Sequence, residues 1–245
     1  MDQLAKINQQ IDLSEAMKTL GKLDERQLAG LMKMLKTKRH KSQSDLPPID
    51  GDFYNLDYKL TKEQRELQMK VRHLMEDEIR PLVNDHWNRA KFPFEIIEKF
   101  KKLNIAGIPY EGYGCPNLPF LMEGIIAQEI ARVDVSTSTF FGVHSGLAMG
   151  SIYLCGSEEQ KQKWLPQMQK LEKIGAFGLT EPNVGSGVAG GLETTCKFDG
   201  ENWILNGQKK WIGNATFADV TIIWARDEDS NQVKGFLVEK DNPGF

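Results

Sequence analysis

The sequence has 245 residues, of which 40% are hydrophobic and 27% charged, and its 31 Lys and Arg against 34 Asp and Glu give a net charge of −3. This composition is typical of globular proteins and excludes collagen-like, low-complexity and largely disordered chains. The near-neutral charge also excludes an extended basic surface, so we expect neither nucleic acid nor an acidic membrane as a partner.

The cysteines and the uncharged segments limit the chemistry further. Cys115, Cys155 and Cys196 are far apart and form no CxxC pair, so we expect neither a metal site nor a disulfide framework. A reducing compartment fits this pattern, with the cytoplasm as the default and the peroxisome or mitochondrial matrix as alternatives. The uncharged stretch 135–156 is rich in Ser and Thr, which predicts a buried helix or helix pair rather than a membrane span.

Helical patterns occupy the first two thirds of the chain. Residues 1–40 are amphipathic, and residues 41–48 have the Ser and Pro content of a linker. Thr61 with Gln64 and Ser157 with Gln160 are capping boxes that mark helix starts, and Pro166 is expected to end or kink the last helix. Apolar residues at helical spacing between them are Leu67, Val71, Leu74, Ile79, Ile96, Ile97, Phe100, Leu103, Leu121, Ile125, Ile126 and Ile130.

The pattern changes to strands after Gly175. Alternation at 194–198, the apolar runs at 203–205 and 220–225, and the segment 233–239 predict strands. Asn206-Gly207 is the strongest local hairpin signal. Helices followed by strands predict an α+β fold, in which an N-terminal all-α domain precedes a mainly antiparallel β domain. We place a helical extension and linker at 1–50, the α domain at 51–174 and the β domain at 175–245.

Gly185, Gly187 and Gly190 spell the letters of a dinucleotide fingerprint, GxGxxG. That fingerprint requires a strand before it, a helix after it and an acidic residue about 20 positions later. The residues that follow here alternate like a strand, and Lys209 and Lys210 stand where the acid is needed. We therefore expect a turn at these glycines and no Rossmann site.

The same stretch belongs to a set of blocks that resembles the acyl-CoA dehydrogenase and oxidase flavoproteins. Residues 177–186, FGLTEPNVGS, resemble the first signature of that family, and residues 210–214, KWIGN, resemble its second flavin-contacting strand. Further matching blocks are GYGC at 112–115, EIARVD at 129–134 and GSEEQK at 156–161. The resemblance spans roughly residues 55 to 245, and short-chain acyl-CoA oxidases of peroxisomes and glutaryl-CoA dehydrogenases are the most similar groups.

The resemblance implies FAD-dependent α,β-dehydrogenation of a short-chain acyl-CoA, with FAD as hydride acceptor. In the family, the backbone at Leu179 and the Thr180 hydroxyl bind the polar edge of the flavin, Ser186 contacts its pyrophosphate and lies near the substrate, and Trp211 packs on the ring. The cofactor-binding residues implied in this way are Phe177, Gly178, Leu179, Thr180, Gly185, Ser186, Trp211, Ile212 and Gly213. The Glu181-Pro182 corner is structural in the family, and we expect His144 to be a hydrogen-bonded core residue.

Three positions depart from the family pattern. Gly187 replaces an Asp that helps to fix the loop, and Gly213 replaces a Thr or Ser near flavin N5. Ser138 stands where glutaryl-CoA enzymes carry an Arg that pairs with the distal carboxylate. We therefore expect a neutral short acyl group, with Ser138, Thr139 and Ser186 as substrate-binding residues.

The family fold continues into a C-terminal four-helix bundle that supplies the catalytic glutamate and the oligomer interface. No position of this sequence matches that glutamate, so no catalytic residue is assigned. We expect activity only together with a C-terminal half, and a homo-oligomer in that case. The alternative function is a non-catalytic remnant that binds flavin or acyl-CoA weakly, or an interaction protein.

Overall fold

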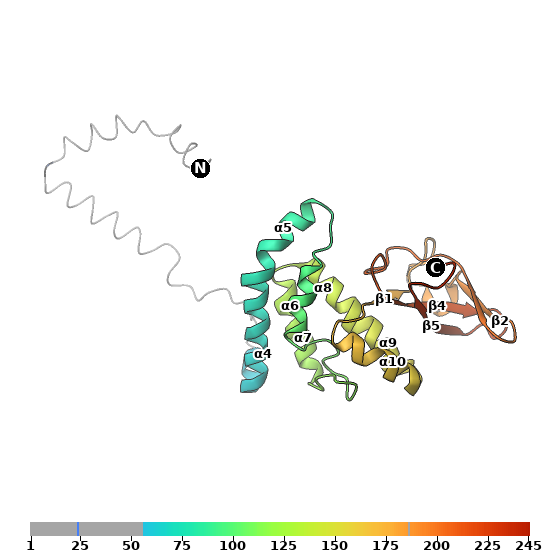
Figure 1. Cartoon of the computed structure of the whole chain (residues 1–245), viewed down its shortest axis with the longest axis horizontal. Coiled ribbons are helices and arrows are strands. Elements are labelled where there is room, and N and C mark those ends of the chain that lie inside the picture. Colours follow the sequence, from blue (N-terminus) through green and yellow to red (C-terminus); the bar gives the residue numbers. More distant parts are fainter. Residues whose placement is uncertain (1–23, 25–55, 186) are drawn as a thin grey trace. The chain divides into compact units, whose positions relative to one another are not determined.

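The structure, a computed structural model, describes residues 24, 56–185 and 187–245. The chain divides into two compact units, 1–55 and 56–245. The helices predicted at 1–40 and the linker predicted at 41–48 lie outside the described residues. All elements given below belong to the second unit, in which helices precede a sheet (Figure 1). The predicted order of an α part followed by a β part is confirmed.

Two of the helical runs are interrupted by a π-helical turn. The first consists of α4 (Lys62–His73), η2 (Leu74–Ile79) and α5 (Arg80–Asn88), and the second of α8 (Val135–Gly142), η3 (Val143–Ala148) and α9 (Met149–Cys155). The remaining helices are η1 (Leu56–Lys59), α6 (Glu95–Lys101), α7 (Phe120–Ala131) and α10 (Glu158–Gln169). π turns inside α-helices frequently mark functional sites.

Local sequence signals account for the helix starts. In both predicted capping boxes the side chain of the cap accepts from the backbone N–H three residues on, at 3.3 Å for Thr61 and 3.2 Å for Ser157. Asp134 caps α8 in the same way, accepting from the Thr137 N–H at 2.6 Å. Pro166 lies inside α10, which continues to Gln169, so of the two expected effects, ending or kinking the helix, the first is wrong.

The helical core contains most of the apolar residues that the spacing predicted, but Leu121 is 39% exposed. The largest fully buried side chains of the core include Phe100, Ile96, Ile126, Ile130, Met149, Ile152 and Leu165. Burial of one such side chain contributes roughly 1.5–3 kcal/mol. This core holds α8 and η3 against their neighbours, and so fixes one wall of the site described below.

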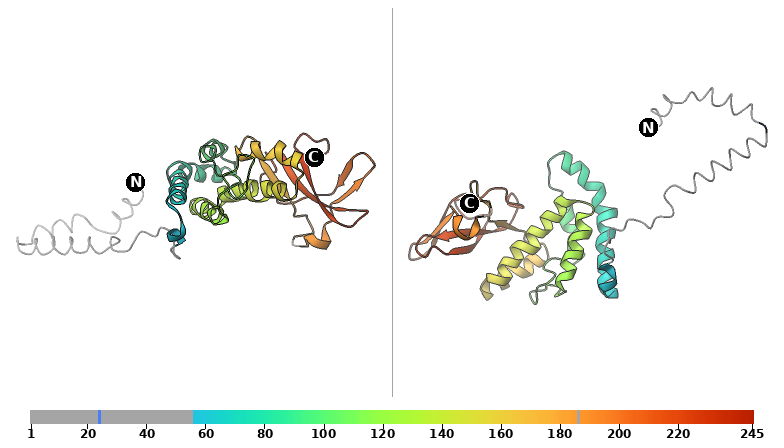
Figure 2. Two further views of the ribbon diagram at one scale, coloured as in Figure 1. Left: turned by 90° about the horizontal axis from the view of Figure 1, so that it is seen from below. Right: turned by 180° about the vertical axis from the view of Figure 1, so that it is seen from behind.

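The strands are β1 (Gly175–Gly178), β2 (Thr195–Phe198), β3 (Trp203–Asn206), β4 (Val220–Asp227) and β5 (Val233–Glu239). They form a mixed sheet around β4 (Figure 2). β5 pairs antiparallel with β4 along its whole length, and β3 pairs antiparallel with β2. β1 and β2 pair parallel with the beginning and the end of β4, respectively.

One predicted turn is wrong. Asn206-Gly207 ends β3 without starting a hairpin, because the next strand begins only at Val220. The hairpin between β2 and β3 turns instead at Asp199–Asn202, where the Asp199 carboxylate accepts the N–H groups of Glu201 and Asn202 at 2.9 and 2.7 Å. After Gly207 the chain leaves the sheet, and this departure produces the loop that carries the second family signature.

β1 packs directly on η3. The Gly175 N–H donates to Nδ1 of His144 at 3.1 Å, and a Cβ at Gly175 would lie 2.6 Å from the Cβ of Ala148. Only glycine permits this approach of strand to helix. The junction brings the end of α8, η3 and β1 together.

Candidate flavin-facing site

The first predicted segment lies at the end of β1. Phe177 and Gly178 are the last residues of this strand, and Leu179 and Thr180 follow it. Gly178 is buried, and a Cβ there would lie 2.6 Å from Cδ1 of Ile223 on the neighbouring strand β4. The strand therefore packs tightly against β4 up to the residue at which the predicted flavin contacts begin.

The second predicted segment crosses this strand end. The Lys210 N–H donates to the Thr180 carbonyl at 2.8 Å, so the two signatures, about thirty residues apart in the sequence, lie side by side. The segment is a loop rather than the strand that the family resemblance implied, since residues 207–219 contain no strand. Its residues Ile212 and Gly213 are half-buried, and a Cβ at Gly213 would lie 3.2 Å from Cγ2 of Val143 in η3.

Trp211 has an unusual backbone and an exposed ring. Its φ is 59°, in the left-handed region, and 83% of the residue is exposed. A bulky residue in this region costs roughly 1–3 kcal/mol and persists only where surrounding contacts enforce it. The only cation near its ring among the described residues is Lys210, whose Nζ lies 4.4 Å from the ring centroid. The indole thus offers a free planar surface beside the end of β1.

A buried ion pair holds the start of the loop. The Glu181 carboxylate, only 2% exposed as a residue, accepts from Lys209 Nζ at 2.7 Å and from the N–H groups of Glu193 and Thr194 at 2.6 and 2.9 Å. Burial raises the pKa of Glu181, but the hydrogen bonds from Lys209, Thr194 and Glu193 outweigh it and lower the pKa to about 2. These contacts agree with the structural role expected for Glu181.

Asn214 closes the loop on the helical side. Its side-chain Nδ2 donates to the Phe140 carbonyl of α8 and to the Gly175 carbonyl of β1, both at 3.1 Å. α8 also carries the predicted substrate residues, of which Ser138 is half-buried and Thr139 exposed. The Thr139 hydroxyl donates to the Val135 carbonyl at 3.0 Å. Sequence reasoning missed both Lys209 and Asn214, because their partners are remote in the chain.

The glycine-rich stretch follows the first signature. Gly185 is exposed, and Ser186 lies outside the described residues. Gly187 precedes a four-residue helix, α11 (Val188–Gly191), which corrects the expectation that a strand follows at once. β1 and β2 are not neighbours in the sheet, since β4 pairs with both. This is not the strand–helix unit of a dinucleotide fingerprint.

His144 is a core residue, as expected. It is fully buried, with Nε2 2.9 Å from the Met168 carbonyl and Nδ1 accepting from the Gly175 N–H. Burial lowers its pKa to about 4, while the bond to Met168 acts in the opposite direction. The imidazole is therefore neutral near pH 7 and belongs to the helix–strand junction.

Two further observations concern the described residues as a whole. In 56–185 and 187–245, no group of three or more His, Cys, Asp and Glu side chains could hold a metal ion. No helix in these ranges has the length and apolar character needed to cross a membrane.

Comparison with known protein families identifies the family of both parts of the chain. Residues 61–187 match the acyl-CoA dehydrogenase N-terminal domain, and residues 176–245 match the acyl-CoA dehydrogenase middle domain. The chain belongs to the acyl-CoA dehydrogenase family. Members of this family are flavoprotein oxidoreductases with FAD as cofactor.

The relatives are similar over about half of their own length. The short-chain-specific acyl-CoA dehydrogenase of Clostridium acetobutylicum is 34% identical over 194 residues, which are 78% of this chain and 51% of that protein. The mitochondrial isovaleryl-CoA dehydrogenase of Pongo abelii is 33% identical, over 82% of this chain and 48% of that protein. The chain thus spans about half the length of the curated relatives that it matches.

Solved structures give the same result. A glutaryl-CoA dehydrogenase from Mycobacterium smegmatis in complex with FADH2 has a TM-score of 0.74 at 38% identity, over 78% of this chain and 49% of that one. Butyryl-CoA dehydrogenase from Megasphaera elsdenii has a TM-score of 0.70 at 28% identity, over 76% and 50%. The C-terminal helical domain of the family is not covered by this chain.

Proposed function

We propose that this chain forms the helical and flavin-facing parts of an FAD-dependent dehydrogenase or oxidase of short, uncharged acyl-CoA thioesters. The observation that carries the proposal is the hydrogen bond from the Lys210 N–H to the Thr180 carbonyl. It places the two segments that the family uses for its cofactor side by side, with α8 connected to them through Asn214.

The residues present fit a planar ring with a polar edge. The exposed Trp211 indole supplies an apolar surface on which such a ring can stack. The backbone at Leu179 and the Thr180 hydroxyl, at the end of β1, supply hydrogen-bonding groups for the polar edge. Bound FAD would supply the hydride acceptor, while the protein positions the reactants.

The substrate assignment depends on α8. Ser138 is half-buried on this helix, and neither it nor the exposed Thr139 carries a charge. A distal carboxylate would lack the bidentate cation that favours a dicarboxylyl group. We therefore propose butyryl-CoA-like rather than glutaryl-CoA-like substrates, and a catalytic base supplied by a C-terminal part of the enzyme.

Flavin titration tests the cofactor assignment. Quenching of FAD fluorescence by the chain should saturate, and Trp211→Ala should weaken binding at least about tenfold through loss of stacking. Trp87→Ala is the matched control, because Trp87 is also exposed but lies on α5. No quenching, or equal quenching by both variants, would contradict the proposal.

Binding and turnover test the remaining parts. Butyryl-CoA should bind to the FAD-loaded chain more tightly than glutaryl-CoA, and Ser138→Arg should reverse this order. With butyryl-CoA and an artificial acceptor, the chain alone should give no product. Product formation would show that a catalytic base is present in these residues.

A further inference from the structure

The loop 210–213 is held at both of its ends by side chains that have no assigned role. Lys209 precedes the loop, and its Nζ bonds to the Leu179 carbonyl at 3.1 Å and to the Glu181 carboxylate at 2.7 Å. Asn214 follows the loop and bonds to the Phe140 and Gly175 carbonyls. Both residues therefore attach the loop to β1 or to the chain that leaves it.

The first attachment is strong because it is buried and charged. In this pair the Lys209 side chain is 9% exposed and the Glu181 side chain is fully buried. A buried charge is stable only with a partner, so the carboxylate holds the ammonium in one place. The ammonium in turn holds the Leu179 carbonyl, directly before the residue whose carbonyl accepts from the Lys210 N–H.

The second attachment connects three elements. Asn214 has a φ of 67°, a left-handed conformation that Asn adopts more readily than most residues. Its side-chain amide spans from α8, at the turn before the π-helical η3, to the first residue of β1. Its own carbonyl accepts the N–H groups of Phe217 and Ala218. The end of the loop therefore cannot shift without breaking contacts on both sides.

Trp211 lies between these attachments in its own left-handed conformation, with a ring that few contacts restrain. The free chain would relax from this conformation, because a bulky residue disfavours it. The side-chain hydrogen bonds that hold the loop lie at its two ends, at Lys209 and Asn214. Accordingly, we propose that Lys209 and Asn214 are positioning residues, which together hold the Trp211 ring and the loop backbone in the orientation that receives the flavin.

This inference rests on the proposed flavin-binding function, but one of its consequences can be measured without flavin. In the full chain, hydrogen exchange of the Lys210 amide should be protected by its bond to the Thr180 carbonyl. Lys209→Met and Asn214→Asp should each accelerate that exchange at least about tenfold. The Asn214→Asp side chain has the same shape as Asn but directs an oxygen at two carbonyl oxygens. Lys197→Met on β2 is the control and should leave the exchange rate of the Lys210 amide unchanged.

Flavin binding is the second readout. The same two variants should raise the Kd for FAD about tenfold or more. They should also reduce the fine structure of the visible absorbance band of the bound flavin. Lys209→Arg keeps the cation and should restore much of the affinity and the band. Asn214→Gly keeps the left-handed turn without the amide, and a weak affinity in this variant assigns the effect to the side chain.

The outcomes separate the two proposals. If Lys209→Met does not fold, the neutral double variant Glu181→Gln/Lys209→Met replaces it, since no buried charge then remains unpaired. If the wild-type chain binds no FAD, the proposed function fails, and exchange of the Lys210 amide alone decides the positioning role. Wild-type exchange in folded Lys209→Met and Asn214→Asp variants, or wild-type affinity and absorbance in both, would overturn the inference.

Discussion

His144 is the residue whose ionisation state most directly affects the helix–strand junction. Its ring accepts the Gly175 N–H on one side and donates to the Met168 carbonyl on the other. Protonation would place two donors, Nδ1–H and the Gly175 N–H, opposite each other in a buried site. The neutral form is therefore the one that the fold requires.

The free energy of unfolding should consequently depend on pH through His144. The pKa is about 4 in the folded chain and 6.5 as the reference value, so the unfolded chain binds the proton first as pH falls. Stability should decrease between about pH 6.5 and pH 4, by about 3 kcal/mol in total. Urea unfolding as a function of pH should show this decrease in the wild type and in the exposed-site control His73→Gln. If the free energy of unfolding of His144→Gln falls with decreasing pH as steeply as that of the wild type, the assignment is contradicted.

Gly178 is a residue at which the sheet is packed tightly near the site. A Cβ there would lie 2.6 Å from Cδ1 of Ile223 and 3.2 Å from the Ile222 carbonyl. Gly178→Ala should destabilise the protein by about 1–3 kcal/mol, because the buried strand cannot move aside.

Gly124 on α7 provides the contrast, since a Cβ there meets nothing within 4 Å. Gly124→Ala should stabilise the protein by about 0.5–1 kcal/mol through helix propensity. Thermal melting of both variants tests the pair. A Gly178→Ala variant that melts at or above the wild-type temperature would show that the close approach at Gly178 does not limit packing.

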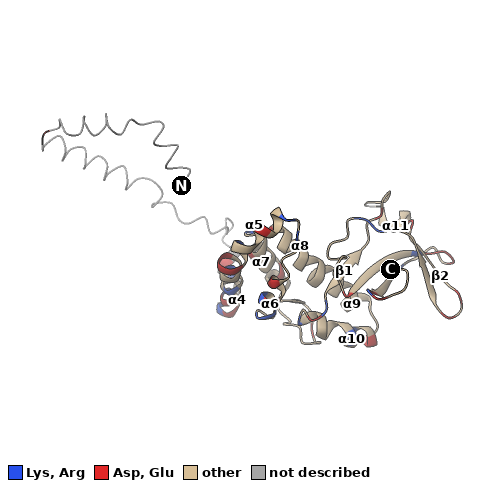
Figure 3. Cartoon of the chain, turned by 45° about the horizontal axis from the view of Figure 1, so that its top comes forward, with Lys and Arg blue, Asp and Glu red and all other residues tan. Residues whose placement is uncertain are grey.

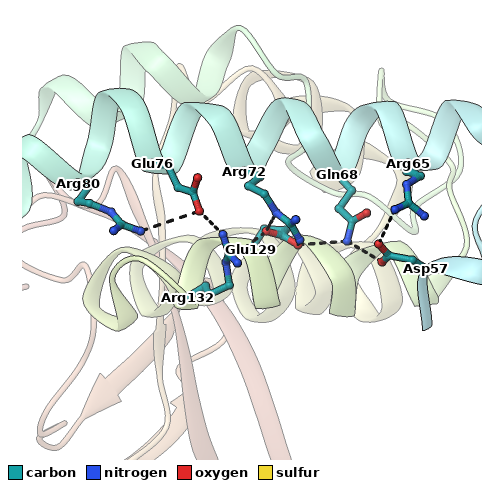
Figure 4. A network of polar contacts seen from close by, with 8 residues as sticks. All are labelled: Asp57, Arg65, Gln68, Arg72, Glu76, Arg80, Glu129 and Arg132. Atoms are coloured by element: carbon teal, nitrogen blue, oxygen red, sulfur yellow. Dashed lines mark hydrogen bonds and ion pairs between the residues drawn. The ribbon is translucent and has the colours of Figure 1, made fainter. Parts of the chain in front are cut away.

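At the scale of elements, α4 and α7 are joined by a network of charged and polar side chains (Figure 4). Glu129, fully buried, accepts from Arg72 at 2.8 and 2.6 Å and from Gln68 at 3.1 Å. Gln68 continues to Asp57, and Arg132 pairs with Glu76. The Glu129 carboxylate at the centre is neutralised by Arg72, with Arg132 Nε 3.7 Å away.

Removal of that carboxylate should be costly. Glu129→Leu leaves Arg72 without its buried partner and should lower the free energy of unfolding by about 3–5 kcal/mol. The double variant Arg72→Met/Glu129→Leu should recover part of this loss. Arg89→Ala, which breaks the exposed pair with Asp85 on α5, should cost under about 1 kcal/mol. A Glu129→Leu variant as stable as Arg89→Ala would contradict a structural role for the network.

The network also accounts for a charged side chain of α4 at its contact with α7. Helix α4 carries both basic and acidic residues (Figure 3). Arg72 pairs with Glu129 of α7 and Arg65 with Asp57 of η1, while Glu63, Glu66 and Lys70 are exposed. The same helix thus buries Val71 and still presents a polar surface.

At the scale of the whole molecule, the second unit exposes apolar surface on its sheet. A cavity of about 570 Å³ is lined by residues of β3, β4, β5, the loop after Gly207 (Lys209, Ile212 and Ala215) and the segment 242–245. Within this lining, Trp203 is 40% and Ile204 54% exposed on β3, which pairs only with β2 among the described strands. An apolar patch next to an open strand edge favours association.

We therefore expect the chain to self-associate through this surface as its concentration rises. Ile204→Lys should lower the association constant at least about tenfold, because burial of the isoleucine is lost. Leu154→Lys is the matched control, since Leu154 is 77% exposed but lies on α9 and outside the sheet. Analytical ultracentrifugation across a concentration series distinguishes them, and equal effects of both variants would contradict the assignment of the surface.

Elements defined by neighbouring residues were predictable from the sequence. The Thr61 and Ser157 capping boxes form between residues three apart, so their geometry follows from local chemistry. The hairpin predicted at Asn206-Gly207 was wrong because a tertiary contact outweighs the local turn propensity. The backbone at Gly207 lies so close to Thr194 that a Cβ on Gly207 would be 2.6 Å from the Thr194 Cα. No local pattern contains that contact.

The sequence by itself determined that helices precede strands, the helix starts at Thr61 and Ser157, and the membership of the family, because each is carried by residues close together in the chain. Tertiary structure decided how the site is held. The Lys209 and Asn214 side chains reach partners that are 28 to 74 residues away, and the left-handed, exposed Trp211 follows from them. Such positions depend on which distant carbonyls and carboxylates the completed packing brings within hydrogen-bonding distance.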